Sequence, residues 1–264
     1  MVKVYTIASG KGGTGKTTVS VNLGTILAEL GKETYLMDAD IGMANVGLVL
    51  GLQDAPITLH EVLAGKGKIT DAIYEGPAGL KVIPSGISLQ GFQQADPDRI
   101  REVMTEIVKR CEFLLIDAPA GISKDGVVPL AVADEVILVV NPEISSIVDA
   151  LKTKILTEVV GGHVKGAIIN RVDQEKTDVI TRKMEKVLGV KVIGIIPEDS
   201  NVRRSSSAKT PIVIKFPASP ASKAFRRIAS DIIGVTYTEE AAAPAKEGFI
   251  DRFTKVLFKK KPQA

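Results

Sequence analysis

Seven short apolar runs, separated by stretches with helical spacing, constrain the fold of this chain more than any other feature. The runs are rich in β-branched residues and mostly lack alternation, which is typical of strands buried on both faces of a parallel sheet. They occupy residues 2–8, 34–38, 80–84, 113–117, 135–141, 164–170 and 191–196. The intervals fit helices, such as 17–30 before Gly31 and 98–110 after Pro97. This alternation predicts an α/β fold with a doubly wound, mostly parallel sheet and helices on both faces, a Rossmann-like layer sandwich.

Composition narrows the class of protein. The 264 residues are 45% hydrophobic and 25% charged, which excludes a mainly disordered or fibrous chain. A net charge of +3 is too small to indicate nucleic-acid binding by the whole chain. Cys111, the single cysteine, cannot form an internal disulfide, and no apolar run reaches the roughly 20 residues of a membrane span. We therefore expect a cytoplasmic protein.

A glycine-rich segment follows the first predicted strand and opens a helix. Residues 10–17, GKGGTGKT, match G-x-x-x-x-G-K-[ST], and this strand-loop-helix setting is the one that the P-loop motif requires. The glycines let backbone N–H groups converge on phosphate oxygens, Lys16 neutralises the β- and γ-phosphates, and Thr17 offers a hydroxyl to Mg²⁺. The predicted phosphate-binding residues are Gly10, Lys11, Gly12, Gly13, Thr14, Gly15, Lys16, Thr17 and Thr18.

Three aspartates stand at the ends of two predicted strands. Asp38 and Asp40 flank Ala39, and their i, i+2 spacing aims both side chains to the same side of the sheet. Asp117 ends another apolar run. Since ligands of open α/β sheets bind outside the carboxyl ends of the strands, we expect all three carboxylates to face the phosphate loop. A single such aspartate would be equally well explained as a turn former or helix cap.

Several motifs together resemble a known family. KGGTGKTT at 11–18, DADIGMANV at 38–46, DAPAGI at 117–122 and IPED at 196–199 are similar to those of the deviant Walker A ATPases, the MinD/ParA family, and within it the MinD subfamily. The resemblance covers essentially the whole chain. It implies a P-loop ATPase that uses ATP/ADP and Mg²⁺, is monomeric with ADP and forms a face-to-face homodimer with ATP. It also implies protein partners, an activator and a division inhibitor, at the switch and dimer surfaces.

The resemblance assigns roles to individual residues. Lys11 would reach the phosphates of the other protomer, which makes dimerisation a condition for stabilising the transferring phosphoryl group. The catalytic residues would be Lys11, Lys16 and Asp40, with Asp40 positioning or activating the attacking water. Asp38, in the same switch segment, would be among the cofactor-binding residues. Thr17 and Asp117 would hold the metal. The base-side residues would be Asn170, Arg171, Pro197, Glu198 and Asp199, although Asn170 and Pro197 are also explained as strand-end turn residues.

The C-terminal segment differs from the rest of the chain. Residues 236–247 read as a solvated linker between a body at 1–235 and a tail at 248–264. On a helix, the apolar tail residues fall within an arc of about 120°, with basic side chains beside them and Phe258 off the stripe. These membrane-contacting candidates are Phe249, Ile250, Phe253, Val256 and Leu257. The pattern predicts a helix that lies on an anionic membrane surface, whereas its alternative is a terminal helix docked on its own domain.

One such helix binds lipid only marginally, but two helices in a dimer gain by effective concentration. We therefore hypothesise an ATP-hydrolysing spatial regulator, peripheral on the inner face of the cell membrane, that positions the cell-division site or other cellular machinery.

Two other classes remain open. A ParA-like DNA-partitioning ATPase, the less favoured interpretation, would bind non-specific DNA through basic surface residues: Arg203, Arg204, Lys223, Arg226 and Arg227. A metal-cluster maturation or nitrogenase-reductase-type protein is disfavoured by the lone Cys111. We expect His60 and His163 at the surface or in loops without a catalytic or metal role, and we identify no chemistry in residues 51–79.

Overall fold

The computed structural model describes residues 2–86, 93–96, 99–121, 124–173 and 177–236, and all seven predicted strands are present in it. An eighth strand of two residues, β3, was not predicted. The strands are β1 (Lys3–Ala8), β2 (Thr34–Asp38), β3 (Tyr74–Glu75), β4 (Lys81–Ile83), β5 (Phe113–Asp117), β6 (Glu135–Val140), β7 (Val164–Val172) and β8 (Val192–Pro197). They form one sheet in the order β3-β4-β2-β5-β1-β6-β7-β8, in which β3 pairs antiparallel with β4 and the other pairs are parallel.

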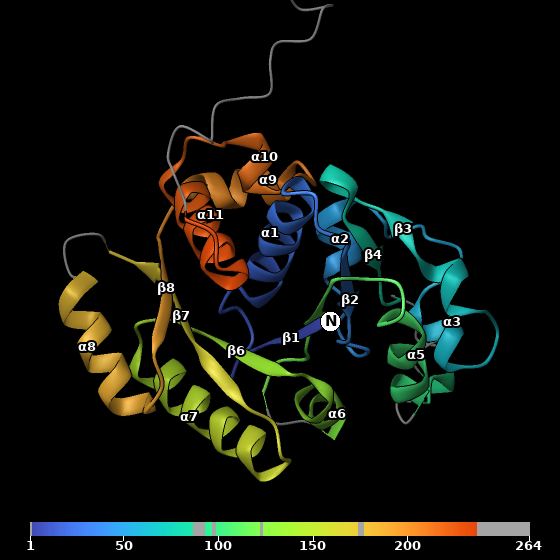
Figure 1. Cartoon of the computed structure of the whole chain (residues 1–264), viewed down its shortest axis with the longest axis horizontal. Coiled ribbons are helices and arrows are strands. Elements are labelled where there is room, and N and C mark those ends of the chain that lie inside the picture. The colour runs from blue at the N-terminus through green and yellow to red at the C-terminus, as the bar shows by residue number, and fades with distance from the viewer. Residues whose placement is uncertain (1, 87–92, 97–98, 122–123, 174–176, 237–264) are drawn as a thin grey trace, which may run out of the picture.

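Helices cover both faces of this sheet (Figure 1). The longer ones include α1, α7, α8 and α11, and the predicted helix 98–110 is present as α5. The bounds are α1 (Lys16–Glu29), α2 (Val46–Leu50), α3 (Leu59–Leu63), α5 (Ile100–Ile107), α6 (Lys124–Val132), α7 (Ile144–Val159), α8 (Thr177–Leu188), α9 (Ser200–Ser207), α10 (Ile212–Lys215) and α11 (Pro220–Ile233), with 3₁₀ turns at Ile69–Ala72 and Pro77–Gly79.

The core lies in two layers because successive residues of a strand point to opposite faces. Leu115 of β5 belongs to the layer beneath α1, α10 and α11, while its neighbours Leu114 and Ile116 belong to the layer beneath α3 and α5. A third cluster packs α6, α7 and α8 against β6 and β7. Strands apolar throughout are thus buried on both faces, and the predicted doubly wound architecture is confirmed.

Strand register brings the predicted aspartates together. Asp38 at the end of β2 pairs with Asp117 at the end of β5, and Asp117 also pairs with Ile7 of the central strand β1. The phosphate-loop segment leaves the carboxyl end of β1 at this same edge, so the sheet delivers both elements to one place. The predicted linker at 236–247 and tail at 248–264 lie almost entirely outside the described residues, and both stay predictions. Across the described ranges, none of the helices combines the length and apolarity that crossing a membrane requires.

Candidate functional site

The phosphate loop wraps a cavity of about 430 Å³ at the carboxyl ends of the strands. Gly15 precedes α1 in the left-handed conformation, with φ of 93°, and Gly13 is left-handed as well, so both positions favour glycine. The Thr14 hydroxyl oxygen is buried without a hydrogen-bond partner among the residues described. Of the predicted phosphate-binding residues, those lining the cavity are Lys11, Gly12, Gly13, Thr14, Gly15, Lys16, Thr17 and Thr18.

Gly10, also predicted to bind phosphate, instead packs against α7. A Cβ at this position would lie 2.1 Å from the carbonyl carbon of Asp149, so no larger residue fits without displacing the helix. The first glycine of the motif therefore serves the close approach of the loop to α7.

Asp117 is the centre of a buried polar cluster. Its Oδ2 accepts a hydrogen bond of 2.6 Å from the Thr17 hydroxyl, and its Oδ1 lies 3.3 Å from Lys16 Nζ. Ser20, one turn further along α1, donates to the same Oδ1 at 3.0 Å. Ser20 was not predicted as a site residue, because a serine at this helical position looks like any other buried small residue. Lys16, Thr17 and Asp117 thus lie together as predicted, and Ser20 completes the group.

Asp38 organises the loop that follows β2. Its side chain is fully buried and accepts backbone N–H groups of Asp40, Asn45 and Val46 at 3.1, 3.0 and 3.0 Å. Burial, followed by the neighbouring Asp117 carboxylate, raises the pKa of Asp38, and the three N–H donors oppose the rise only in part. Asp38 therefore anchors this loop and does not line the cavity. The expectation that all three carboxylates face the phosphate loop is met by Asp40 and Asp117, whereas the Asp38 carboxylate is used by its own loop.

Asp40 lies in that loop and does line the cavity. Its Oδ1 accepts the Met43 N–H at 2.9 Å. Partial burial raises its pKa, opposed by the Met43 hydrogen bond and then by the charge of Lys16. The carboxylate predicted to act on water is thus half-buried beside the phosphate loop.

Lys11 extends away from the other phosphate-loop residues toward α7. Its Nζ lies 2.8 Å from Glu143 Oε2 and 3.0 Å from the Ser145 hydroxyl oxygen, and this ion pair is exposed. Exposed pairs of this kind contribute little to stability because water competes for both partners. The lysine can therefore exchange this carboxylate for another anion at low cost.

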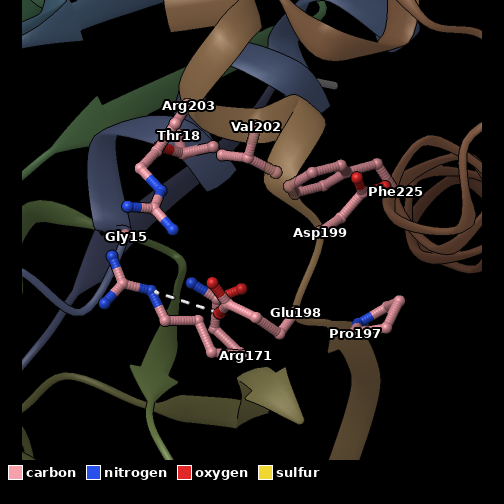
Figure 2. Close-up of a pocket in the computed structure, with 10 residues that line it drawn as sticks. Gly15, Thr18, Arg171, Pro197, Glu198, Asp199, Val202, Arg203 and Phe225 are labelled. Carbon is pink, nitrogen blue, oxygen red and sulfur yellow. Dashed lines mark ion pairs between the residues drawn. The ribbon is translucent and has the colours of Figure 1, made fainter. Parts of the chain in front are cut away.

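A second cavity of about 270 Å³ adjoins the first, sharing Gly15, Thr18 and Arg171 with it. Figure 2 shows Thr18, Val202 and Arg203 along one side of this cavity, facing Arg171 and Glu198. All five predicted base-side residues line it: Asn170, Arg171, Pro197, Glu198 and Asp199. A cavity of this size beside a loop of backbone donors could take the base end of a nucleotide whose phosphates lie on the loop.

Two of these residues also hold the cavity wall in place. Asn170 Nδ2 donates to the Thr14 carbonyl at 2.7 Å, and a Cβ on Gly15 would lie 2.3 Å from that nitrogen. Asp199 caps α9 by accepting the Asn201 N–H at 2.9 Å. Arg171 has a left-handed backbone, with φ of 59°, which is uncommon for a side chain of this size and is concentrated at functional sites.

The basic residues that a DNA-binding role would use lie in different surroundings. Arg203 lines the second cavity, and its side chain extends into the same space as that of Arg171 (Figure 2). Arg226 pairs with Glu29 at 2.9 Å, and Arg204 lies over the Phe216 ring. Arg203 is therefore part of the candidate nucleotide site.

The expectation for His60 was wrong. His60 is 1% exposed and lies on α3, with Nε2 2.9 Å from the Ile41 carbonyl oxygen, whereas His163 is exposed as expected. A lone histidine carries no sequence signal that separates these two outcomes.

Half-buried Cys111 has a pKa raised to about 11 by burial, and among the described residues no cluster of histidine, cysteine and acidic side chains could hold a metal ion. The tail residues Phe249, Ile250, Phe253, Val256 and Leu257 lie outside the described residues.

The residues present fit a magnesium nucleotide. The hydroxyl of Thr17 and the carboxylate of Asp117 supply hard oxygen atoms, and Mg²⁺ in nucleotide sites takes few protein ligands besides the phosphates. The buried, unpartnered Thr14 hydroxyl and the open sides of Gly12 and Gly13, where an added Cβ meets nothing within 4 Å, leave room for phosphate oxygens.

This fold and site define a P-loop nucleotide-binding protein. Residues 5–212 match the CobQ/CobB/MinD/ParA nucleotide-binding domain, and the chain belongs to this family. It is 50% identical over 258 residues to an uncharacterized ATP-binding protein of Methanocaldococcus jannaschii, covering 98% of this chain and 97% of that protein.

Two solved structures are similar over nearly their full length. The cell-division ATPase MinD of Pyrococcus furiosus is 36% identical with a TM-score of 0.84, covering 89% of this chain and 99% of that one. The septum site-determining protein MinD of Pyrococcus horikoshii, complexed with Mg-ADP, is 35% identical with a TM-score of 0.82, covering 93% and 100%. These likenesses confirm the predicted family and fold.

Proposed function

We propose that this protein is a Mg²⁺-dependent ATPase that dimerises with ATP and binds the membrane surface through its C-terminal segment. The proposed ATPase activity rests on two adjoining cavities. One is lined by the phosphate loop and Asp40, and the other by residues 170–171 and 197–199. The Mg-ADP complex of the P. horikoshii protein supports the choice of nucleotide.

Each residue has a distinct task in the proposed reaction. Backbone N–H groups of the phosphate loop and the Lys16 ammonium would hold the β- and γ-phosphates. Thr17 and Asp117 would hold Mg²⁺, which would supply positive charge against the charge that develops on the phosphates. The Asp40 carboxylate would accept a hydrogen bond from the attacking water and so orient it. Asp40 must be ionised to act on the water, and its pKa is raised. We therefore expect hydrolysis to decrease as pH falls, and the decrease should begin at a higher pH than for an ordinary aspartate.

The dimer and membrane parts of the proposal are supported mainly by the sequence. Lys11 is held by an exposed ion pair with Glu143 and a hydrogen bond to the exposed Ser145, so it could leave both partners to engage the phosphates of a second protomer. If the tail is helical, its sequence would place an apolar stripe beside basic side chains; residues 249–261 contain five basic side chains and one acidic one. ATP-driven pairing would present two such tails and strengthen attachment to anionic lipid. Protein partners would then dock on the switch and dimer surfaces, and the protein would position division or other machinery.

The test measures ATP hydrolysis, dimerisation and co-sedimentation with anionic vesicles for the full-length protein. Wild type should hydrolyse ATP only with Mg²⁺ and should sediment with vesicles more in ATP than in ADP. Lys11→Ala should lose ATP-dependent dimerisation and vesicle binding, and Phe253→Ser should weaken vesicle binding alone. Phe258→Ser is the matched control, because Phe258 lies off the predicted stripe. Absence of hydrolysis would overturn the ATPase, whereas equal sedimentation in both nucleotides would overturn the membrane switch.

A DNA-partitioning role is the alternative outcome. Retention on non-specific DNA that falls steeply with salt, in the absence of vesicle binding, would establish it.

A further inference from the structure

Two side chains that do not line the nucleotide cavities form hydrogen bonds to the backbone of the loop between β2 and α2. Asp40 is the central residue of a tight turn closed by the Ile41 N–H, which donates to the Ala39 carbonyl at 3.1 Å. Behind this turn, the Ser85 hydroxyl donates to the Asp38 carbonyl at 3.1 Å, and His60 Nε2 lies 2.9 Å from the Ile41 carbonyl oxygen. One side chain therefore holds the entry of the turn and another its exit.

The direction of the histidine hydrogen bond follows from its partner. A carbonyl oxygen only accepts, so Nε2 carries the proton and donates. The ring is 1% exposed, and its Nδ1 has no hydrogen-bond partner in the described part of the chain. Burying a polar ring with one nitrogen unpaired is costly, and a residue needed only for packing would be served by an apolar side chain. The single donated bond is thus the property that distinguishes histidine at this position.

The surroundings leave the ring little freedom. Leu59, its neighbour on α3, donates its N–H to the Pro84 carbonyl at 2.9 Å, which ties α3 to the segment after β4. Gly86 in that segment lies against the ring, since a Cβ there would lie 2.4 Å from His60 Nδ1. The donor is consequently preset in direction, as a group that positions a catalytic loop must be.

We propose that His60 is a positioning residue for the ATPase reaction: through the Ile41 carbonyl it holds the turn that presents Asp40 to the phosphate cavity. This inference rests on the proposed function. Asp40 is one peptide unit from the tethered carbonyl, so a released Ile41 lets the carboxylate move relative to the phosphates. Nucleotide binding, which uses other residues, should be preserved.

Two amide substitutions separate the hydrogen bond from polarity and size. In His60→Gln the amide nitrogen reaches roughly the place of Nε2, whereas in His60→Asn it reaches only that of Nδ1. We expect His60→Gln to keep kcat within about twofold, and His60→Asn and His60→Leu to lower kcat about tenfold or more. The KM for ATP and the Kd for ADP should change less than about twofold in all three. Equal loss in the Gln and Asn variants, no loss in any of them, or a loss confined to KM would overturn the proposal.

A second measurement does not depend on activity. Hydrogen exchange of the backbone amides at residues 39–46 should be faster than wild type in His60→Asn and His60→Leu and unchanged in His60→Gln. Gly86→Ala, which pushes on the ring without changing it, should reproduce the Asn result. If wild type hydrolyses no ATP, the proposed function fails while this comparison still tests the tether. Unchanged exchange in the Asn and Leu variants would refute the tether itself.

Discussion

Lys11 Nζ and Glu143 Oε2 lie 2.8 Å apart and connect the phosphate loop to the residue that caps α7. The Ser145 hydroxyl oxygen accepts a hydrogen bond of 3.0 Å from the same ammonium group. A lysine predicted to act on a second protomer is thus held within its own protomer by two exposed partners. In the proposed dimer, Lys11 would have to exchange this internal anion for the phosphates of the second protomer.

The first prediction concerns that exchange. Glu143→Gln removes the competing charge, so we expect ATP-dependent dimerisation to become about two- to threefold tighter at low salt, with the difference shrinking as salt screens the pair. Sedimentation velocity at several salt concentrations measures it. Glu158→Gln, which breaks an exposed pair with Lys154 on the same helix, is the control and should change nothing. Weaker dimerisation in Glu143→Gln would show that the pair supports the dimer.

The second prediction concerns Ser20. Ser20→Ala removes one donor to the Asp117 carboxylate, so we expect Mg²⁺-dependent nucleotide affinity to fall severalfold and unfolding free energy to fall by about 1–2 kcal/mol. Titration of a fluorescent ADP analogue with and without Mg²⁺, together with urea unfolding, measures both. Thr25→Val on the same helix loses only a bond to a backbone carbonyl and should leave affinity unchanged. Equal affinity in both variants would argue against a role for Ser20.

The third prediction separates backbone strain from steric conflict. Gly15 and Gly161 both have left-handed backbones, but an added Cβ meets Asn170 at Gly15 and open space at Gly161. We expect Gly161→Ala to lower the unfolding free energy by about 1 kcal/mol and Gly15→Ala to lower it by clearly more. Gly15→Ala should also weaken nucleotide binding, because it displaces the Asn170 side chain. Equal destabilisation of the two variants would mean that Asn170 moves aside without cost.

The fourth prediction concerns pH. The raised pKa of Asp38 means that the folded chain binds a proton more tightly than the unfolded chain. Stability should therefore fall as pH rises from the ordinary aspartate pKa, about 4, to the raised value, and stay constant above it. Asp38→Asn removes this contribution, so thermal unfolding between about pH 4 and the raised pKa of about 7 should show a shallower decline, with Asp40 retaining part of it. A decline as steep as that of wild type would contradict the assignment.

Sequence patterns predicted most of the fold because parallel strands buried on both faces leave runs that are apolar throughout. The phosphate loop was predicted from its motif, and the meeting of Asp40 and Asp117 with that loop was predicted because strand ends converge at one edge. The burial of Asp38 beneath its own loop was not predicted. The two-residue strand β3 is too short to carry a periodicity. Ser20, Glu143 and His60 act through contacts between distant segments, and nothing in their local sequence distinguishes them from ordinary helix residues.

The small strand β3 has a consequence beyond the fold. Strand β3, which consists of only Tyr74 and Glu75, pairs antiparallel with β4 and forms this edge of the sheet. An edge of two residues offers a second chain very few backbone groups with which to extend the sheet. A protein proposed to gather on a membrane reaches high local concentrations there. Such crowding would favour strand-to-strand aggregation from a long open edge, and β3 would protect this side of the sheet during the proposed assembly.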